Sequence, residues 1–254
     1  MPDLPIQHPA LWRAADTLRA TACREQGRQG IPSGFARLDE ALPDGGWPQD
    51  GLVELLCPEF GGDADLVAPL LRQLGTQERW QVWINPPWLP YAPALGQQGV
   101  ALGQALLLHC RDDKDVLWAM EQCLASGSCS IVQAWPARLQ PHQIRRLHLA
   151  AQKGSALGLL LRPQACAQQP SPAPLRLELA TRQQALQVRV LKRRGGWGFD
   201  WLTLKAPQDT LPMGAGSMQA AAASDIATAT QTPADAVPHG PRVLHWHTPG
   251  SPGA

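Results

Sequence analysis

The sequence predicts an α/β fold with a mostly parallel sheet flanked by helices. Apolar runs of strand length alternate with helical patterns from residue 33 to about residue 161, an order typical of βαβ units. After Pro163, three short runs lie close together and alternate with period two, as Leu175, Leu177 and Leu179 do. These runs indicate an antiparallel extension at the C-terminal side of the same sheet.

Each expected element follows from the spacing of its apolar residues. The five strands of the first part are expected at residues 52–56, 80–85, 105–109, 130–135 and 156–161. The helices between them are expected at residues 66–74, 114–125 and 142–152. The three strands of the extension are expected at residues 175–180, 186–191 and 199–204.

The chain divides into one core domain and two flanking segments. Residues 1–30 are expected to hold a short amphipathic helix, with Leu11, Ala15 and Leu18 on one face, followed by a linker. Residues 31–206 form the core domain. Residues 207–254 are rich in Ala, Thr, Gln, Pro and Gly and have almost no periodic apolar pattern, so a disordered tail is expected.

Composition argues against several classes of protein. The 254 residues carry a formal net charge of +1, so neither bulk attraction to DNA nor attraction to a membrane surface is expected. The six cysteines have neither a C-x-x-C pair nor a zinc spacing, and we expect them to be reduced. The sequence has neither a secretory signal pattern nor an apolar run of membrane-spanning length. A soluble cytoplasmic protein is expected.

The segment between the first predicted strand and the next predicted helix lies where a nucleotide-binding loop belongs. It reads Cys57-Pro-Glu-Phe-Gly-Gly-Asp-Ala-Asp65 and lacks the lysine and the hydroxyl residue that such a loop needs. The fold is therefore expected to have lost its nucleotide chemistry, so function depends on what the protein binds.

Residues 32–204 resemble RecA-type recombinases in the order and spacing of several segments. The run Pro32-Ser-Gly-Phe-Ala-Arg-Leu-Asp-Glu-Ala-Leu42, then Gly45-Gly46-Trp47-Pro48 and Gly51-Leu-Val-Glu54, resembles the lead into the RecA phosphate loop. The resemblance implies a RecA-like core.

This resemblance places a degenerate phosphate loop at residues 57–64. The first glycine is replaced by Cys57, Gly61 and Gly62 remain, the lysine is replaced by Asp63 and the hydroxyl residue by Ala64. An anion in place of a cation about 4 Å from phosphate exchanges an attraction of about 4 kcal/mol for a similar repulsion at an effective dielectric near 20. Tight ATP binding is therefore not expected.

The two acidic positions of RecA-like catalysis are also lost. The glutamate that would orient the attacking water falls at Pro87, and the aspartate of the magnesium shell falls at Ala134. We therefore expect a protein with neither enzymatic activity nor a bound cofactor or metal. Asp63 has two further interpretations: a cap on the following helix, which would fill the phosphate site itself, or an acidic contact with a partner.

Further motifs resemble the ImuA family, whose members are RecA-like and related to the division inhibitor SulA. They are Trp83-Ile-Asn-Pro-Pro-Trp-Leu-Pro-Tyr-Ala-Pro93, Ala134-Trp-Pro-Ala-Arg138 and Leu191-Lys-Arg-Arg-Gly-Gly196. The resemblance implies an adaptor in SOS-induced translesion synthesis. Its implied partners are ImuB, RecA and the error-prone DNA polymerase III α-subunit, with indirect association to DNA.

Two alternatives stay open. One is a SulA-like inhibitor that binds the division protein FtsZ; the other is a residual RecA-like ATPase or DNA-binding protein. Candidate partner contacts are the basic run Lys192, Arg193 and Arg194, and Trp47 and Trp88 in loops. Trp246, in an apolar cluster of the tail, is a further candidate. Trp83, Trp88, Trp118 and Trp135 fall on or beside core elements, and most of these four are expected to pack inside.

Overall fold

A computed structural model describes residues 29–58, 63–136, 138–182, 185–194, 198, 200–204 and 242–245. Its strands are β1 (Gly51–Cys57), β2 (Trp80–Ile84), β3 (Ala105–His109), β4 (Cys129–Ala134), β5 (Leu157–Pro163), β6 (Leu175–Arg182), β7 (Ala185–Lys192), β8 (Leu202–Leu204) and β9 (Arg242–His245). Its α-helices are α2 (Ala36–Ala41), α3 (Asp63–Leu74), α4 (Ala92–Gln97), α5 (Asp113–Ala125) and α6 (Pro141–Lys153). Short 3₁₀ helices cover Leu102–Gln104 (η1) and Gln164–Gln168 (η2).

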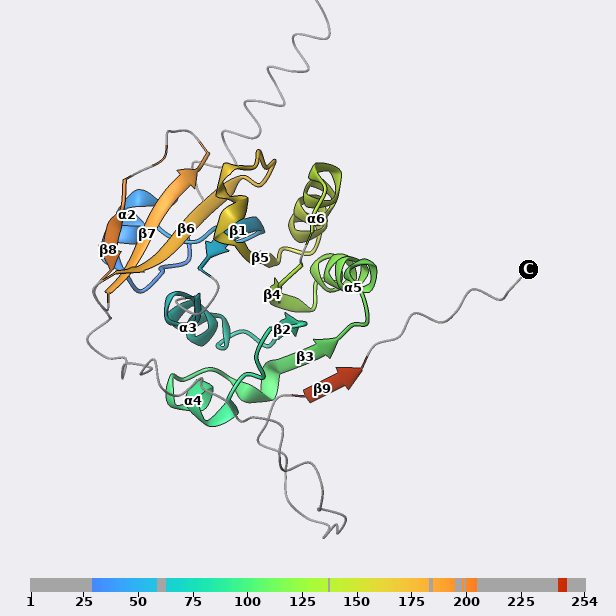
Figure 1. Cartoon of the computed structure of the whole chain (residues 1–254). Coiled ribbons are helices and arrows are strands. Elements are labelled where there is room, and N and C mark those ends of the chain that lie inside the picture. Colours follow the sequence, from blue (N-terminus) through green and yellow to red (C-terminus); the bar gives the residue numbers. More distant parts are fainter. Residues whose placement is uncertain are drawn as a thin grey trace, which may run out of the picture.

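All nine described strands form one sheet, in the order β8-β7-β6-β1-β5-β4-β2-β3-β9 (Figure 1). Only β7 runs against its neighbours, because β6 joins β1 in parallel and pairs with β7 antiparallel. The mixed α/β class and the mostly parallel sheet are confirmed. The extension is antiparallel within β6–β8, although it is joined to the parallel part through a parallel pair.

Helices cover the two faces of the sheet in two groups. Leu38 of α2 and Leu70 of α3 belong to one apolar core, whereas Met120 of α5 and Leu147 of α6 belong to a second core on the opposite face. Successive residues of a strand point to opposite faces, so the buried runs of β1, β4 and β5 feed both cores. We refer to these faces as the α3 side and the α6 side.

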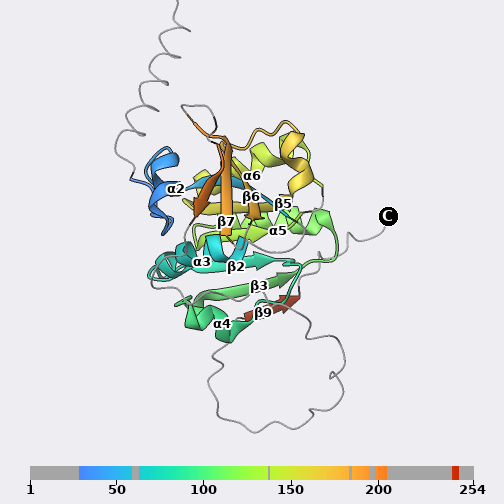
Figure 2. The ribbon, with the colours of Figure 1, turned by 60° about the vertical axis from the view of Figure 1, so that its left-hand side comes forward.

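The strand at residues 242–245 corrects the prediction of a wholly disordered tail. β9 pairs in parallel with β3, from Leu106↔Arg242 to His109↔His245, and Figures 1 and 2 both show it beside β3. An edge strand exposes a row of backbone N–H and C=O groups, and a segment from the tail satisfies part of that row here. Residues 205–241 and 246–254 lie outside the described residues, as does the helix predicted within residues 8–22.

Other boundaries agree closely with the pattern of apolar residues, but two short helices were missed. α2 and α4 have six residues each, too few to show a helical period in the sequence. Among the described residues no helix is long and apolar enough to cross a membrane.

Candidate functional site

The degenerate phosphate loop leaves from the carboxyl end of β1. β1 lies between β5 and β6 in the sheet, and α3 begins at Asp63 after the loop. Cys57 is half-buried, and its thiol contacts the carbonyl oxygen of Leu55 at 3.9 Å. Gly61, Gly62 and the side chain of Asp63 lie outside the described residues, so the two interpretations of Asp63 stay predictions.

The two positions of the lost acids lie at the ends of neighbouring strands. Ala134 ends β4 and is fully buried, whereas Pro87 follows β2 and is exposed. Neither side chain carries a carboxylate. Among the described residues, no cluster of three or more His, Cys, Asp or Glu side chains is arranged to hold a metal ion.

The helices change sides of the sheet at the carboxyl edge around β2. β2 is followed by α4 on the α3 side, while its neighbours β3 and β4 lead into α5 and α6 on the opposite side. In open α/β sheets, such a change of side marks the place where ligands bind. The carboxyl edge around β2 is therefore a candidate binding site.

Asn85 fixes the first turn of this edge. Its backbone has φ 47°, a left-handed conformation that Asn tolerates better than most residues. The side-chain amide donates to the carbonyl oxygen of Cys110 at 2.9 Å, and its oxygen accepts from the Cys110 N–H at 2.7 Å. This pair of hydrogen bonds joins the loop after β2 to the loop after β3.

Three large apolar side chains are exposed in the loop that Asn85 starts. Trp88 is 48 % exposed, Leu89 75 % and Tyr91 65 %. We call residues 86–91 the tryptophan loop; it also contains three prolines, which restrict its backbone. A stiff loop loses little entropy when it binds, so exposed aromatic and aliphatic side chains on it are suited to anchor a protein partner. The structure thus places the predicted contact Trp88 at the surface.

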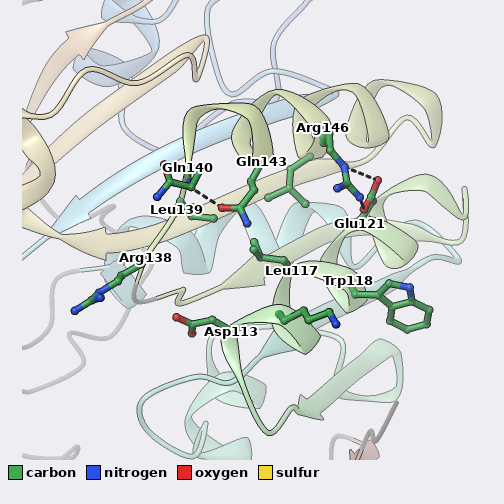
Figure 3. Close-up of a pocket in the computed structure, with 11 residues that line it drawn as sticks. Asp113, Leu117, Trp118, Glu121, Arg138, Leu139, Gln140, Gln143 and Arg146 are labelled. Atoms are coloured by element: carbon green, nitrogen blue, oxygen red, sulfur yellow. Dashed lines mark hydrogen bonds and ion pairs between the residues drawn. The ribbon is translucent and has the colours of Figure 1, made fainter. Parts of the chain in front are cut away.

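A groove of about 440 Å³ lies between α5 and α6 at the same edge (Figure 3). Leu117 of α5 lies toward Leu139 and Gln143, which lie before and in α6, and Trp118 lines the groove with its ring directed away from them. Figure 3 shows the ion pair of Arg146 and Glu121 at one end of the groove and Arg138 toward the other.

Trp118 corrects a prediction, because it is 41 % exposed rather than packed inside. The buried residues of α5 are Asp115, Val116, Ala119, Met120 and Leu124. Trp118 lies between those rows, four residues after Lys114 and three before Glu121, which also line the groove. This polar spacing was the signal in the sequence that could have revealed a surface tryptophan.

Trp47 is not available to a partner, so that prediction is wrong. Its side chain is fully buried in the core of the α3 side. Its backbone exchanges two hydrogen bonds with Ile31, each 2.7 Å long. The glycines and proline around Trp47 suggested a surface loop, but they form a tight bridge that closes over the core instead.

The basic run at residues 192–194 does not form one patch. Lys192 donates to the carbonyl oxygen of Ser171 at 2.9 Å, whereas Arg193 donates to that of Ala41, also at 2.9 Å. These acceptors lie on different segments, since Ala41 ends α2. Arg193 thus holds α2 against the sheet. Burial, then the positive charge of Arg176, lowers the pKa of Lys192. Trp246, the remaining candidate, lies outside the described residues.

Comparison with known proteins identifies the family of the central region. The family of the cell division inhibitor SulA matches residues 62–158. The SulA of Edwardsiella piscicida is 39 % identical over 121 residues, which make up 46 % of this chain and 71 % of that protein. The SulA of Serratia proteamaculans is 36 % identical over 127 residues, 49 % of this chain and 74 % of that protein. This chain belongs to the SulA family.

A solved SulA from Pseudomonas aeruginosa is also similar to this chain. It is 28 % identical, covers 44 % of this chain and 97 % of its own, and superposes with a TM-score of 0.38. The family match and the relatives confirm the expected relation to SulA, whereas the finer assignment to ImuA stays a prediction. Residues 62–158 include β2, β3 and β4 with α3 to α6, and hence both the tryptophan loop and the groove.

Proposed function

We propose that this protein is a cell division inhibitor, as its SulA relatives are named, and that it acts by binding FtsZ. The observation that carries the proposal is family membership over the region that holds the exposed carboxyl edge. The relatives support this alternative better than the adaptor role in translesion synthesis that the ImuA resemblance implies. The expected mechanism is that the protein occupies a surface of FtsZ in the cytoplasm and catalyses no reaction.

The tryptophan loop is the proposed contact. Trp88, Leu89 and Tyr91 expose apolar surface that water solvates poorly, and Asn85 and the prolines hold the loop in place. Burying such anchors at the centre of an interface is worth about 2 kcal/mol or more for each residue, which is roughly thirtyfold in affinity.

Sedimentation of FtsZ polymers tests the proposal. The wild-type protein is expected to reduce the pelleted FtsZ in a dose-dependent way, and Leu89→Asp to weaken this effect by about thirtyfold. Leu149→Asp is the matched control, because Leu149 is also exposed, at 63 %, but lies on α6. Wild-type activity of the Leu89→Asp protein would exclude the loop. A wild-type protein without effect on FtsZ would exclude the division role itself.

The adaptor of translesion synthesis is a second candidate, favoured by the strands outside the SulA match. β1 and β6–β8 lie outside residues 62–158, and β1 is an inner strand of the sheet, followed by a loop with the spacing of a phosphate loop. This arrangement supports a RecA-like core that has kept its architecture without nucleotide chemistry. Capture of ImuB rather than FtsZ from equal mixtures would favour the adaptor, and capture of FtsZ alone would exclude it.

A further inference from the structure

The end of the sheet formed by β6, β7 and β8 is apolar on one face and polar on the other. Leu177 and Leu179 of β6 and Val188 and Val190 of β7 are buried on the α3 side. Their neighbours in the strands point to the α6 side. There α6 packs on β1 and β5, α5 packs on β4 and β2, and the short η2 packs on β1 and β6, so the main helix contacts on this side reach only as far as β6 among the described elements.

Two arginines and a tryptophan meet on this polar face. The guanidinium of Arg182 lies 5.2 Å from the centre of the Trp201 ring, and that of Arg189 lies 5.0 Å from it. Arg182 is exposed, and Arg189 keeps 35 % of its side chain exposed. Stacking on an aromatic ring orients the guanidinium of Arg182 and leaves its N–H groups able to bind anions at the edge, whereas Nε and Nη2 of Arg189 already donate to Glu178.

Lys192 joins the same face because of an irregularity in the strand. The register between β6 and β7 shifts between Arg176 and Leu177, so that Arg176 pairs with Lys192 and Leu177 with Val190. A bulge of this kind re-aims the side chains beyond it. Lys192 therefore points to the side of Arg176 instead of the side of Val190. It is exposed there.

Two acidic side chains of this face, Glu54 and Glu178, are buried and paired with arginines. Glu178 accepts from Arg189 and, at 2.7 Å, from Gln164, and only 7 % of its side chain is exposed. Glu54 is fully buried between Arg162 and Arg176. An exposed acid, Asp200, lies at one end, where its side chain accepts the backbone N–H of Trp201 at 2.8 Å. The exposed cations of this face are therefore Arg182 and Lys192, together with the exposed part of Arg189 that Glu178 does not bind.

We propose that this arginine–tryptophan face, made of Arg182, Arg189, Lys192 and Trp201, binds an acidic polypeptide segment of a partner protein. Carboxylates accept paired hydrogen bonds from guanidinium groups, and the ring between the arginines gives an apolar contact. The face is a docking surface separate from the tryptophan loop and lies outside the residues that match SulA.

An acidic peptide fits this face better than a nucleic acid does. Bases bind such surfaces by stacking on open aromatic rings, whereas two guanidinium groups already lie over Trp201. Nucleic-acid binding also depends on many cations, and the whole chain has a net charge of +1. In addition, β8 pairs only with β7 among the described strands, so its outer edge can pair with an extended segment.

Fluorescence anisotropy with the full-length protein tests this docking surface. The probes are a labelled peptide of alternating glutamate and leucine, a lysine–leucine peptide of equal length and a labelled oligothymidylate. The glutamate peptide is expected to bind, and Arg182→Glu to weaken it by about tenfold or more. Trp201→Leu is expected to weaken it as well, because the arginines lose their support.

Arg145→Glu is the matched control, since Arg145 is exposed on α6 and the change in net charge is identical. Lys192→Glu repeats the test on another strand if Arg182→Glu does not fold. Equal weakening by Arg182→Glu and Arg145→Glu would overturn the proposal, as would tighter binding of the oligothymidylate or absence of binding by the glutamate peptide. These outcomes are independent of FtsZ, whose binding is tested at Leu89.

Discussion

The two halves of the sheet differ in the kind of side chain that they bury. In the half that matches SulA, β2 and β4 are covered on both faces, and Trp83 and Ile131 face one core while Val82 and Val132 face the other. In the other half, β1 and β6 bury charged residues, Glu54 and Arg176, on the α6 side, where α6 and the short η2 pack on β1 and η2 packs on β6. The comparison teaches that the sheet buries an ionic network, instead of apolar side chains alone, where its cover passes from an α-helix to the short η2.

The charged network is the feature most sensitive to mutation. Glu54 Oε1 accepts from Arg162 Nη1 at 2.5 Å, and Oε2 accepts from Arg176 Nε at 2.5 Å. Glu54→Ala would leave two buried guanidinium groups without their carboxylate, so it is expected to lower the free energy of unfolding by about 3–5 kcal/mol. Urea denaturation followed by circular dichroism measures this change.

Glu121→Ala is the matched control in the other half. Glu121 pairs with Arg146 at the surface, where the side chains are 27 % and 63 % exposed. Exposed ion pairs contribute about 0–1 kcal/mol, so this variant is expected to stay close to the wild type. A similar decrease in the free energy of unfolding for Glu54→Ala and Glu121→Ala would contradict the distinction between the two halves.

The half that matches SulA is expected to depend on close packing instead. Gly154 ends α6, and a Cβ added there would lie 2.0 Å from the carbonyl oxygen of Leu124 at the end of α5. Because the obstacle is backbone, Gly154→Ala is expected to push the two helices apart and cost about 1–3 kcal/mol in urea denaturation. Gly103→Ala is the control, since a Cβ there meets nothing within 4 Å. Equal stability of both variants would show that the helices adjust freely.

The sequence predicted this half better than the other for a physical reason. A strand or helix whose apolar residues recur with a regular period can be recognised from one continuous stretch of sequence. The predicted strand at residues 105–109, for example, agrees with β3 at both ends. The Glu54 network joins residues that are 108 and 122 positions apart in the chain, which periodicity does not detect. The polar interior of the sheet was therefore missed.

The candidate contacts show the same limit. Trp88 and Trp47 both lie among prolines or glycines in the sequence, yet the first is exposed and the second is closed under a backbone bridge to Ile31. The run at residues 192–194 is cationic throughout, but a bulge and the carbonyl of Ala41 send its side chains to different places. Local composition predicts that a segment is a loop or carries charge. Pairing with residues far away in the sequence determines whether its side chains are buried and which surface they lie on.

The smallest expected effect lies at the seam of the two halves and depends on pH. His148 of α6 accepts the backbone N–H of Leu52 in β1 through Nδ1 at 3.3 Å. Burial, and then the charge of Arg194, lowers the pKa of His148 below its ordinary value of 6.5, with Asp50 opposing. The folded protein therefore binds this proton less readily than the unfolded chain.

The contribution of His148 to the free energy of unfolding is therefore fully present above pH 6.5. It declines as the pH falls below 6.5 toward the lowered pKa of His148 in the folded protein. His148→Asn keeps a hydrogen-bond acceptor and cannot take up the proton, so it is expected to flatten the decline. Urea midpoints between about pH 8 and pH 5.5 measure it, with His142→Asn as the control because His142 is exposed on the same helix. If the urea midpoint of His148→Asn fell with pH as steeply as that of the wild type, another group would be responsible for the pH dependence, and the contact between α6 and β1 would not depend on pH.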